Sequence, residues 1–311
     1  MRILITGVSG YVGAAVAPHL ARDGHFLRGF ARSPERAAAG GAAIDELVLG
    51  DALTGNGLDR ALDSIDVAYY LMHSMAGTGR QDFAEQELQS AERFSAAARR
   101  AGVRRIVYLG GLLPAEASPS RHLASRLAVE RELLTAADES IAFRASIVIG
   151  ARSRSFRFLV RLVERLPIMA LPSWRDNRTQ PIDGRDVLAY LLRAAEAPAS
   201  AAGRSWDIAG PDAMSYAELI AGIADAMMVS RPTFGLNLTL TPIASVIAAA
   251  IAGEDVGLVE PLMESLSHDL LPRDTEASAV FGVRLHSFTA AVERALRELD
   301  DEPVPPAPEL G

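Results

Sequence analysis

The sequence contains no cysteine and no lysine. The absence of cysteine excludes disulfide bonds, thiolate nucleophiles and cysteine-based metal sites. All 31 basic residues are arginine, so Schiff-base chemistry and a catalytic or phosphate-loop lysine are excluded as well. Arginine does not replace lysine as a proton donor, because its guanidinium group keeps its proton in proteins.

Long apolar runs and blocks of like charge are also missing. The net charge is −8 and the arginines are interspersed with acids, which argues against a nucleic-acid partner. The most apolar stretch, residues 243–252, lies between Pro242 and Gly253 and is far shorter than the ~20 residues of a membrane-spanning helix. A strand-like run begins at Arg2, which leaves no room for a targeting peptide. We therefore expect a soluble, cytoplasmic protein without a membrane span.

Strand-like and helix-like segments alternate through the first half of the chain. The expected strands are residues 2–6, 25–31, 47–49, 67–71, 105–109 and 141–145, and the clearest helices are 11–22, 81–101 and 123–137. This alternation predicts an α/β fold, a Rossmann-type doubly wound parallel sheet with helices on both faces.

The regular alternation of strand-like and helix-like segments ends after Gly150. We expect helices at 156–166 and 185–195, strands near 179–182 and at 205–208, and mostly helices over 215–299. Residues 1–150 are interpreted as a dinucleotide-binding domain to which 179–209 return. Residues 151–178 and 210–299 are interpreted as a smaller, mostly helical substrate lobe, in which the apolar residues 236–251 form a helix. The last segment, 300–311, carries four prolines and is expected to be disordered.

Three glycines lie where the first expected strand leads into the first expected helix. Gly7 permits a tight turn, Gly10 lets the backbone approach a pyrophosphate, and Gly13 lets the helix pack closely on the strand. A lone pattern of this kind could be only a sharp turn, but a strand before it and a helix after it favour dinucleotide binding. Ser9, Tyr11 and Val12 lie within the motif and are expected to contact the same ligand.

The end of the second strand favours NADP(H) over NAD(H). Arg32 follows that strand and no acid lies between Asp23 and Glu35, so Arg32 is expected to pair with a 2′-phosphate. The alternative is a solvated surface arginine. Asp51, with Ala52 beside it, follows the third strand and could meet the adenine amino group or serve as a helix N-cap.

Several segments resemble the short-chain dehydrogenase/reductase superfamily, in its atypical, NmrA-like and extended NAD(P)-binding branch. The resemblance rests on residues 6–13, Gly50-Asp51, Gly110-Gly111, 144–150 and 180–187. Residues 69–75, which read Tyr-Tyr-Leu-Met-His-Ser-Met, resemble a bacterial subgroup of NAD(P)H-binding oxidoreductases with a Tyr-Leu-x-His-Ser-Met segment. The likeness extends over nearly the whole chain, to about residue 299.

The resemblance implies a nicotinamide cofactor and a substrate cleft under the C-terminal lobe. It implies cofactor contacts for Leu71, Met72 and His73 after the fourth strand, for Gly110 after the fifth, and for Ser146 and Ile147 after the sixth.

The usual Tyr-x-x-x-Lys pair of that superfamily is missing. In its place stand His122 and, one helical turn later, Arg126. His122 could donate a proton near neutral pH, and Arg126 could bind the cofactor's ribose or a phosphate but cannot relay a proton. His73 and Tyr70 are the other catalytic candidates. The alternatives are a surface role for His122 and Arg126, and structural roles for His73 and Tyr70. No metal site is apparent.

These features predict hydride transfer between NADPH and a small, hydrophobic carbonyl or enone. A second hypothesis is a non-catalytic NADP(H) redox sensor or assembly factor with a protein partner, which the missing tyrosine and lysine favour. The third, nucleotide-sugar epimerase or dehydratase chemistry, usually depends on the missing tyrosine. The sequence leaves the oligomeric state open, a homodimer included.

Overall fold

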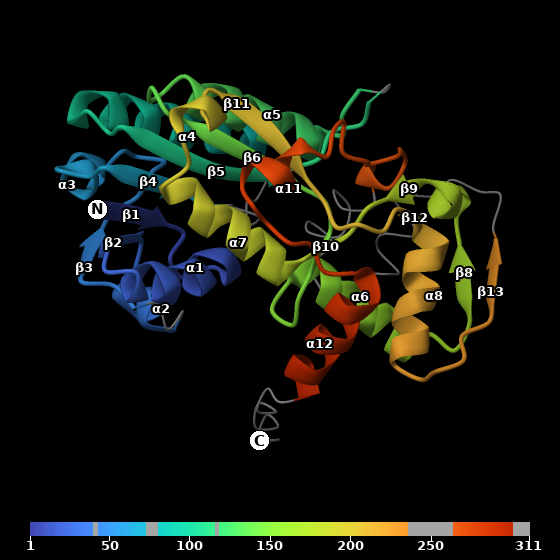
Figure 1. The fold of residues 1–311 in the computed structure, drawn as a ribbon. Helices are drawn as coiled ribbons and strands as arrows, with labels where there is room; N and C mark the ends of the chain where they lie inside the picture. Colours follow the sequence, from blue (N-terminus) through green and yellow to red (C-terminus); the bar gives the residue numbers. More distant parts are fainter. Residues whose placement is uncertain (40–42, 73–79, 116–117, 236–263, 301–311) are drawn as a thin grey trace, which may run out of the picture.

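The computed structural model describes residues 1–39, 43–72, 80–115, 118–235 and 264–300. Its centre is a seven-stranded parallel sheet in the order β11-β6-β5-β4-β1-β2-β3 (Figure 1). The strands are β1 (Arg2–Thr6), β2 (Phe26–Ala31), β3 (Glu46–Leu49), β4 (Val67–Tyr70), β5 (Arg105–Gly111), β6 (Ile141–Ala145) and β11 (Arg204–Ile208). The α/β fold predicted from the alternation of segments is confirmed.

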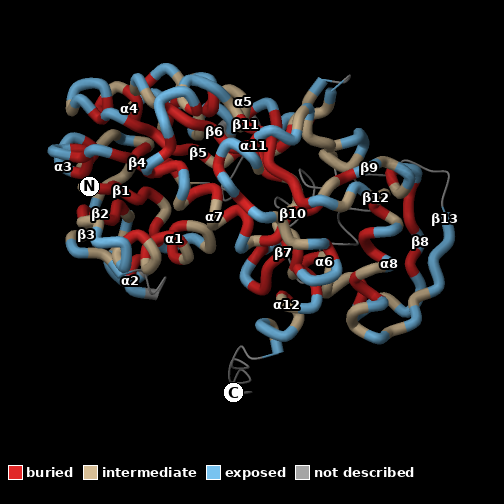
Figure 2. The backbone as a smooth tube through the Cα atoms, viewed as in Figure 1, coloured by how far each residue is buried: buried red, intermediate tan, exposed pale blue. Residues whose placement is uncertain are grey.

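Helices cover both faces of this sheet. One face carries α3 (Leu58–Leu62), α4 (Arg80–Ala101) and α5 (Arg121–Leu134), and the other carries α1 (Tyr11–Arg22), α2 (Pro34–Ala39) and α7 (Gly184–Ala195) (Figure 1). The strands form the most continuous buried part of the molecule (Figure 2). Because both faces of the sheet are covered, the strands are apolar along their length and do not alternate between apolar and polar residues.

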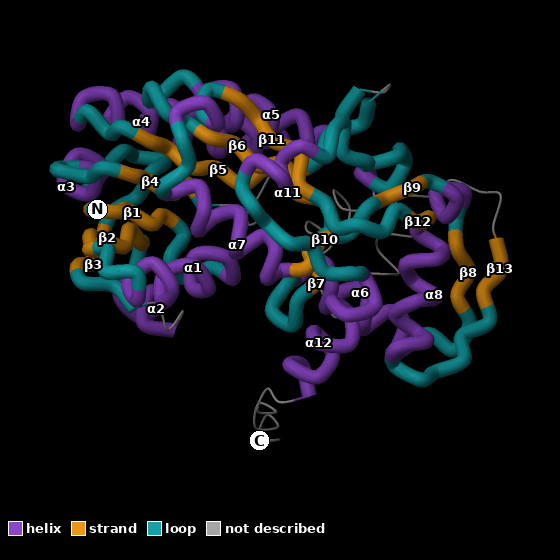
Figure 3. Tube along the Cα trace, in the orientation of Figure 1, coloured by secondary structure: helices purple, strands orange, loops and turns teal. Residues whose placement is uncertain are grey.

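The remaining elements build a smaller lobe beside the carboxyl ends of the strands (Figure 3). Its helices are α6 (Arg154–Arg165), α8 (Tyr216–Ala226) and α12 (Phe288–Asp300), with a short 3-10 helix, η1 (Ser173–Asp176). Its short strands pair as β7 (Val148–Ile149) with β10 (Ile182–Asp183), β9 (Arg178–Thr179) with β12 (Met214–Ser215), and β8 (Met169–Leu171) with β13 (Thr233–Gly235). Phe156, Trp174 and Leu219 lie in its apolar core.

Two further elements connect the lobe to the sheet. The 3-10 helix η2 (Ala199–Ala201) precedes β11, and α11 (Glu276–Val280) packs against β11, where Phe281 joins the core beneath the sheet. The strand β11 pairs with β6, so a segment that follows the first lobe elements returns to the edge of the main sheet. The expected helix at 236–251 lies outside the described residues. Of the expected tail at 300–311, Asp300 is the last residue of α12, and the other residues lie outside the described ones.

Candidate dinucleotide site

The parallel register of the sheet places the carboxyl ends of β1, β2 and β4 side by side. Thr6, the last residue of β1, pairs with Phe30 in β2 and with Tyr70 in β4. The strand order reverses between β1 and β4, because the chain proceeds from β1 to β2 on one side and returns to β4 on the other. Open α/β sheets bind ligands at such a switch point, outside the carboxyl ends of the strands.

The glycines of the first loop have steric reasons to be glycine. Gly7 has a φ of +67°, and a β-carbon there would lie 2.5 Å from the carbonyl oxygen of Leu71. A β-carbon on Gly13 would collide with the carbonyl oxygen of Gly7. Gly10 is the N-cap of α1 and supplies no side-chain cap, and the first turn of α1 holds no acid. The N–H groups of that turn are therefore left for an anionic ligand at the positive end of the helix dipole.

Thr6 links the end of β1 to the end of β4 at the switch point, a role that we did not predict from the sequence. Its hydroxyl donates to the carbonyl oxygen of Tyr69 at 2.9 Å and accepts from the N–H of Leu71 at 3.1 Å. These bonds hold the end of β4 against the glycine loop. The only signal in the sequence was a hydroxyl residue directly before the first glycine.

The other residues of the loop and of the β4 end lie where a ligand could reach them. Ser9 is exposed, and Tyr11 and Val12 are half-buried at the start of α1. Leu71 and Met72 are half-buried and pack against the apolar clusters on opposite faces of the sheet. His73 lies outside the described residues.

Arg32 and Asp51 come to the same edge, beyond β2 and β3. Arg32 is exposed directly after β2, and the N–H of Gly50 donates to the carbonyl oxygen of Ala31 at 3.0 Å. The Asp51 carboxylate accepts from the N–H of Leu53 at 2.8 Å. Asp51 thus stabilises a turn.

The helix N-cap interpretation of Asp51 is wrong, because α3 begins at Leu58 with Gly57 as its N-cap. Ala52 is 6% exposed and its side chain packs in the core, so only its backbone is placed to meet a ligand.

On the other side of the switch point, β5 and β6 end together. Gly110 pairs with Arg144 and Gly111 with Ala145. Ser146 follows β6, and its hydroxyl lies 3.2 Å from that of Thr179 in the lobe strand β9. Ile147 packs against the core of the lobe. Ser146 and Ile147 therefore mark the junction between the sheet and the lobe.

The helix α5 carries the two residues that replace the missing pair. Ser120 is its N-cap and accepts from the N–H of Leu123 at 3.3 Å. His122 is half-buried in the first turn, and Arg126 lies one turn later on the same side. The Cδ atom of Arg126 is 4.0 Å from where a β-carbon of Gly111 would lie. The fold thus brings Arg126 to the end of β5.

The packing of Tyr70 argues against its assignment as an acid. Its side chain is 3% exposed, and its ring lies 5.0 Å from that of Phe94 and 6.2 Å from that of Tyr108, centroid to centroid. Burial raises the pKa of Tyr70 far above its usual value. The neighbouring Tyr69 points to the opposite face and donates to the carbonyl oxygen of Leu191. Both tyrosines are core residues.

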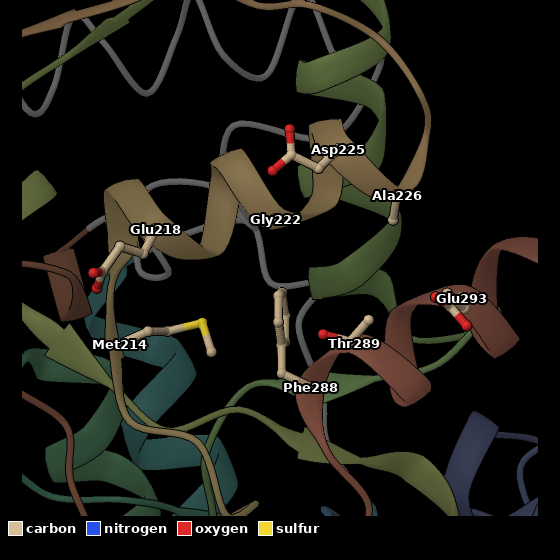
Figure 4. Close-up of a pocket in the computed structure, with 8 residues that line it drawn as sticks. All are labelled: Met214, Glu218, Gly222, Asp225, Ala226, Phe288, Thr289 and Glu293. Carbon is tan, nitrogen blue, oxygen red and sulfur yellow. The ribbon is translucent and has the colours of Figure 1, made fainter.

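The lobe has a surface cavity of about 440 Å³ between α8 and α12 (Figure 4). Its lining combines an apolar part, with Met214 and Phe288, and the carboxylates of Glu218, Asp225 and Glu293. None of its lining residues is one of the site residues predicted from the sequence. Within the described residues, no group of three or more histidine and acidic side chains could hold a metal ion.

Comparison with known proteins agrees with this geometry. Residues 7–141 match a family model described as NAD(P)H-binding. That segment runs from the first glycine of the loop to the start of β6 and contains the switch point. The fold is of Rossmann type, and the matched segment is similar to NAD(P)H-binding domains.

Two curated proteins are distant relatives in sequence. A mitochondrial protein of Arabidopsis thaliana, NADH dehydrogenase [ubiquinone] 1 alpha subcomplex subunit 9, is 24% identical over 69% of this chain and 55% of its own length. The chain thus spans about half the length of this relative. A ceramide reductase of Caulobacter vibrioides is 25% identical over 72% of this chain and 70% of its own length.

Solved structures share the fold over almost the whole chain. A nucleoside-diphosphate-sugar epimerase of Staphylococcus aureus has a TM-score of 0.75 at 14% identity, covering 94% of this chain and 100% of that one. A UDP-glucuronic acid 4-epimerase of Bacillus cereus, solved with UDP-glucuronic acid and NAD, has a TM-score of 0.71 at 14% identity, covering 96% and 99%.

None of the described helices combines the length and the apolar character needed to cross a membrane.

Proposed function

We propose that this chain is an NADP(H)-dependent oxidoreductase that transfers hydride between NADPH and a small, hydrophobic carbonyl or enone. The observation that carries the proposal is the uncapped, acid-free N-terminus of α1 behind Gly7, Gly10 and Gly13, at the switch point of the sheet. The name of the Caulobacter relative, a reductase, supports reduction as the direction of the chemistry.

The preference for the phosphorylated cofactor rests on Arg32. Its guanidinium follows β2 at the edge where the ribose of a dinucleotide would lie, and its two parallel N–H donors match the oxygens of a phosphate. Asp51 would meet the adenine with the carboxylate oxygen that does not accept from Leu53.

The remaining roles fall to residues at the ends of β4, β5 and β6 and on α5. When bound, the reduced nicotinamide supplies the hydride, and the protein supplies orientation and electrostatics. Leu71, Gly110, Ser146 and Ile147 would frame the nicotinamide side. Arg126, at the end of β5, would hold the ribose or a phosphate. His122 or His73 would donate a hydrogen bond to the substrate oxygen and stabilise the charge that develops there.

A second candidate function is a non-catalytic NADP(H) sensor or assembly factor. Two observations favour it: the absence of a Tyr-x-x-x-Lys pair, and a relative named as a subunit of NADH dehydrogenase. This function requires a protein partner. Epimerase or dehydratase chemistry on a nucleotide-linked sugar ranks third. The fold of the structural neighbours favours it, but the missing tyrosine argues against it.

Calorimetric titration with NADPH, NADP, NADH and NAD tests the binding proposal. The same protein is then mixed with NADPH and a panel of ketones, enones and quinones, while the absorbance of the reduced nicotinamide is followed. We expect NADPH to bind most tightly and its oxidation to depend on one class of substrate. Tight binding without oxidation across the panel would instead favour the sensor or assembly role. Failure to bind any dinucleotide would contradict both.

A further inference from the structure

The side chain of Tyr11 makes a contact that the glycine motif does not explain. Tyr11 is the first residue of α1, and its hydroxyl fits between Gly150 and Gly184. A β-carbon added to either glycine would collide with that hydroxyl. Neither glycine has a left-handed φ, so what the contact requires of them is the missing side chain and not backbone freedom.

Gly184 lies at the start of α7, where Asp183 and its arginine partners form a charged cluster that we call the α7 corner. It is the first residue of α7, whose N-cap, Asp183, has a side chain with no exposed surface. The Asp183 carboxylate accepts from the N–H of Arg185 and from the Nη2 atom of Arg294, both at 2.7 Å. Burial opposes ionisation, but these hydrogen bonds and the two guanidinium charges outweigh it and lower the pKa of Asp183.

Arg294 brings the C-terminal helix α12 into this corner. Its guanidinium is 17% exposed and also pairs with Glu298, one turn later. The start of α12 is fixed separately, because the N–H of Phe288 donates to the carboxylate of Asp212 at 2.7 Å. A continuous series of contacts therefore leads from α12 through Arg294, Asp183 and Gly184 to Tyr11.

We propose that Tyr11 and Arg294 are positioning residues for the dinucleotide. The Tyr11 ring holds the first turn of α1 against the α7 corner, and Arg294 holds that corner to α12. The N–H groups that would bind the phosphates belong to this same turn of α1. Dinucleotide affinity therefore depends on a helix of the lobe, at the other end of the chain. This inference rests on the dinucleotide binding proposed above.

A rescue experiment tests the Tyr11 contact. Gly150→Ala places a methyl group against the Tyr11 hydroxyl, so the Tyr11 side chain must move. Because Gly184 closes the other side of that hydroxyl, we expect α1 to move with the ring and the Kd for NADPH to rise about tenfold. Tyr11→Phe removes the hydroxyl and leaves its nearest ring carbon 3.3 Å from the new methyl group, a tight contact that a small shift of the ring relieves. The double variant is compared with the single variant Tyr11→Phe, and its Kd for NADPH should lie within about threefold of that single variant's.

The outcome of the rescue separates positioning from a general effect of the alanine. If Gly150→Ala acted through its own loop, Tyr11→Phe would not restore the affinity. A double variant as weak as Gly150→Ala, or a Gly150→Ala variant with wild-type affinity, would overturn the inference.

A second pair of variants tests the helix α12 without touching the loop. Arg294→Met removes the guanidinium that holds Asp183, and we expect the Kd for NADPH to rise about tenfold. Arg297→Met, an exposed arginine on the same helix, is the matched control and should bind normally. Arg294→Lys keeps a charge for Asp183 and should recover part of the affinity. Melting temperatures without ligand show whether each variant is folded.

The two proposals fail in different ways. If the wild type binds none of the four dinucleotides, the proposed function is overturned and this inference with it. If the wild type binds NADPH and Arg294→Met binds it equally well, only the inference is overturned.

Discussion

At the scale of single residues, Arg32 is the side chain that would distinguish the two cofactors. Arg32→Glu replaces a donor to the 2′-phosphate with a like charge. We expect NADPH binding to weaken by about a hundredfold, and NADH binding to change by less than about threefold. Calorimetric titration of both cofactors checks this. Arg22→Glu, with the same charge change at the far end of α1, is the control. Equal losses for both cofactors would contradict the 2′-phosphate assignment.

In the proposed function, His122 on α5 would act as the acid. His122→Ala should lower the turnover number about a hundredfold while leaving the Kd for NADPH nearly unchanged, because general acid catalysis contributes a factor of about that size or more. Single-turnover oxidation of bound NADPH measures this directly. Arg121→Ala, an exposed neighbour on the same helix, should keep full activity. Unchanged turnover in His122→Ala would exclude His122 and leave His73 as the candidate.

At the scale of elements, the close approach of α1 to the loop after β1 would determine the geometry of the proposed phosphate site. Gly13→Ala places a β-carbon against the carbonyl oxygen of Gly7, which is backbone and cannot rotate away. We expect a loss of about 1–3 kcal/mol in the free energy of unfolding, together with a large loss of dinucleotide affinity. Urea unfolding and calorimetry measure the two effects. Ala15→Ser, on the half-buried side of the same helix, should change neither by more than a small amount.

The sequence predicts the long, regular elements better than the short ones. The limits of β1, α1 and β6 agree with the predicted residues 2–6, 11–22 and 141–145, because each is an apolar run bounded by turn residues. The short helices α2 and α3 were not predicted as separate elements, since they are too short to show a helical period. The strands β7 and β10 have two residues each and owe their existence to pairing across the lobe.

In the candidate site too, local features are predictable from the sequence and contacts between distant residues are not. Local motifs predict the glycine loop, Arg32 and Asp51, because each lies directly after a strand. The pocket for the Tyr11 hydroxyl was beyond prediction, since Gly150 and Gly184 are far from Tyr11 along the chain and only the fold brings them together. Tyr70 was a catalytic candidate because it lies at the end of β4. The sequence did not show its packing against Phe94, which makes it a core residue.

At the scale of the whole molecule, a buried ionic network ties the edge strand β11 to the sheet and to the lobe. Arg144 on β6 pairs with Glu130 on α5, with an Nε–Oε2 distance of 2.9 Å, and lies 3.7 Å from Asp207 on β11. Asp207 also accepts from the backbone N–H and the Nε atom of Arg273, at 3.0 Å and 3.2 Å.

Burial raises the pKa of Asp207 from 3.8 to about 6; Arg144 opposes the rise, and Asp274 and Glu130 add to it. Because the folded state binds the proton more tightly than the unfolded state, the group destabilises the fold above pH 6. That cost disappears as the pH falls toward 3.8. At about 1.4 kcal/mol per pKa unit, the difference amounts to roughly 3 kcal/mol.

Asp207→Asn removes this titration and keeps the shape of the side chain. The free energy of unfolding of the wild type, taken relative to Asp207→Asn, should therefore rise by roughly 2.5 kcal/mol between pH 7 and pH 4. Other titrating groups contribute equally to both proteins and cancel in the difference. Urea unfolding of both proteins across this range measures it, with Asp225→Asn, an exposed carboxylate on α8, as the control. If the difference stays constant with pH, or falls as the pH is lowered, then Asp207 is ionised in the fold at neutral pH without penalty. The guanidinium groups of Arg144 and Arg273 would then outweigh its burial.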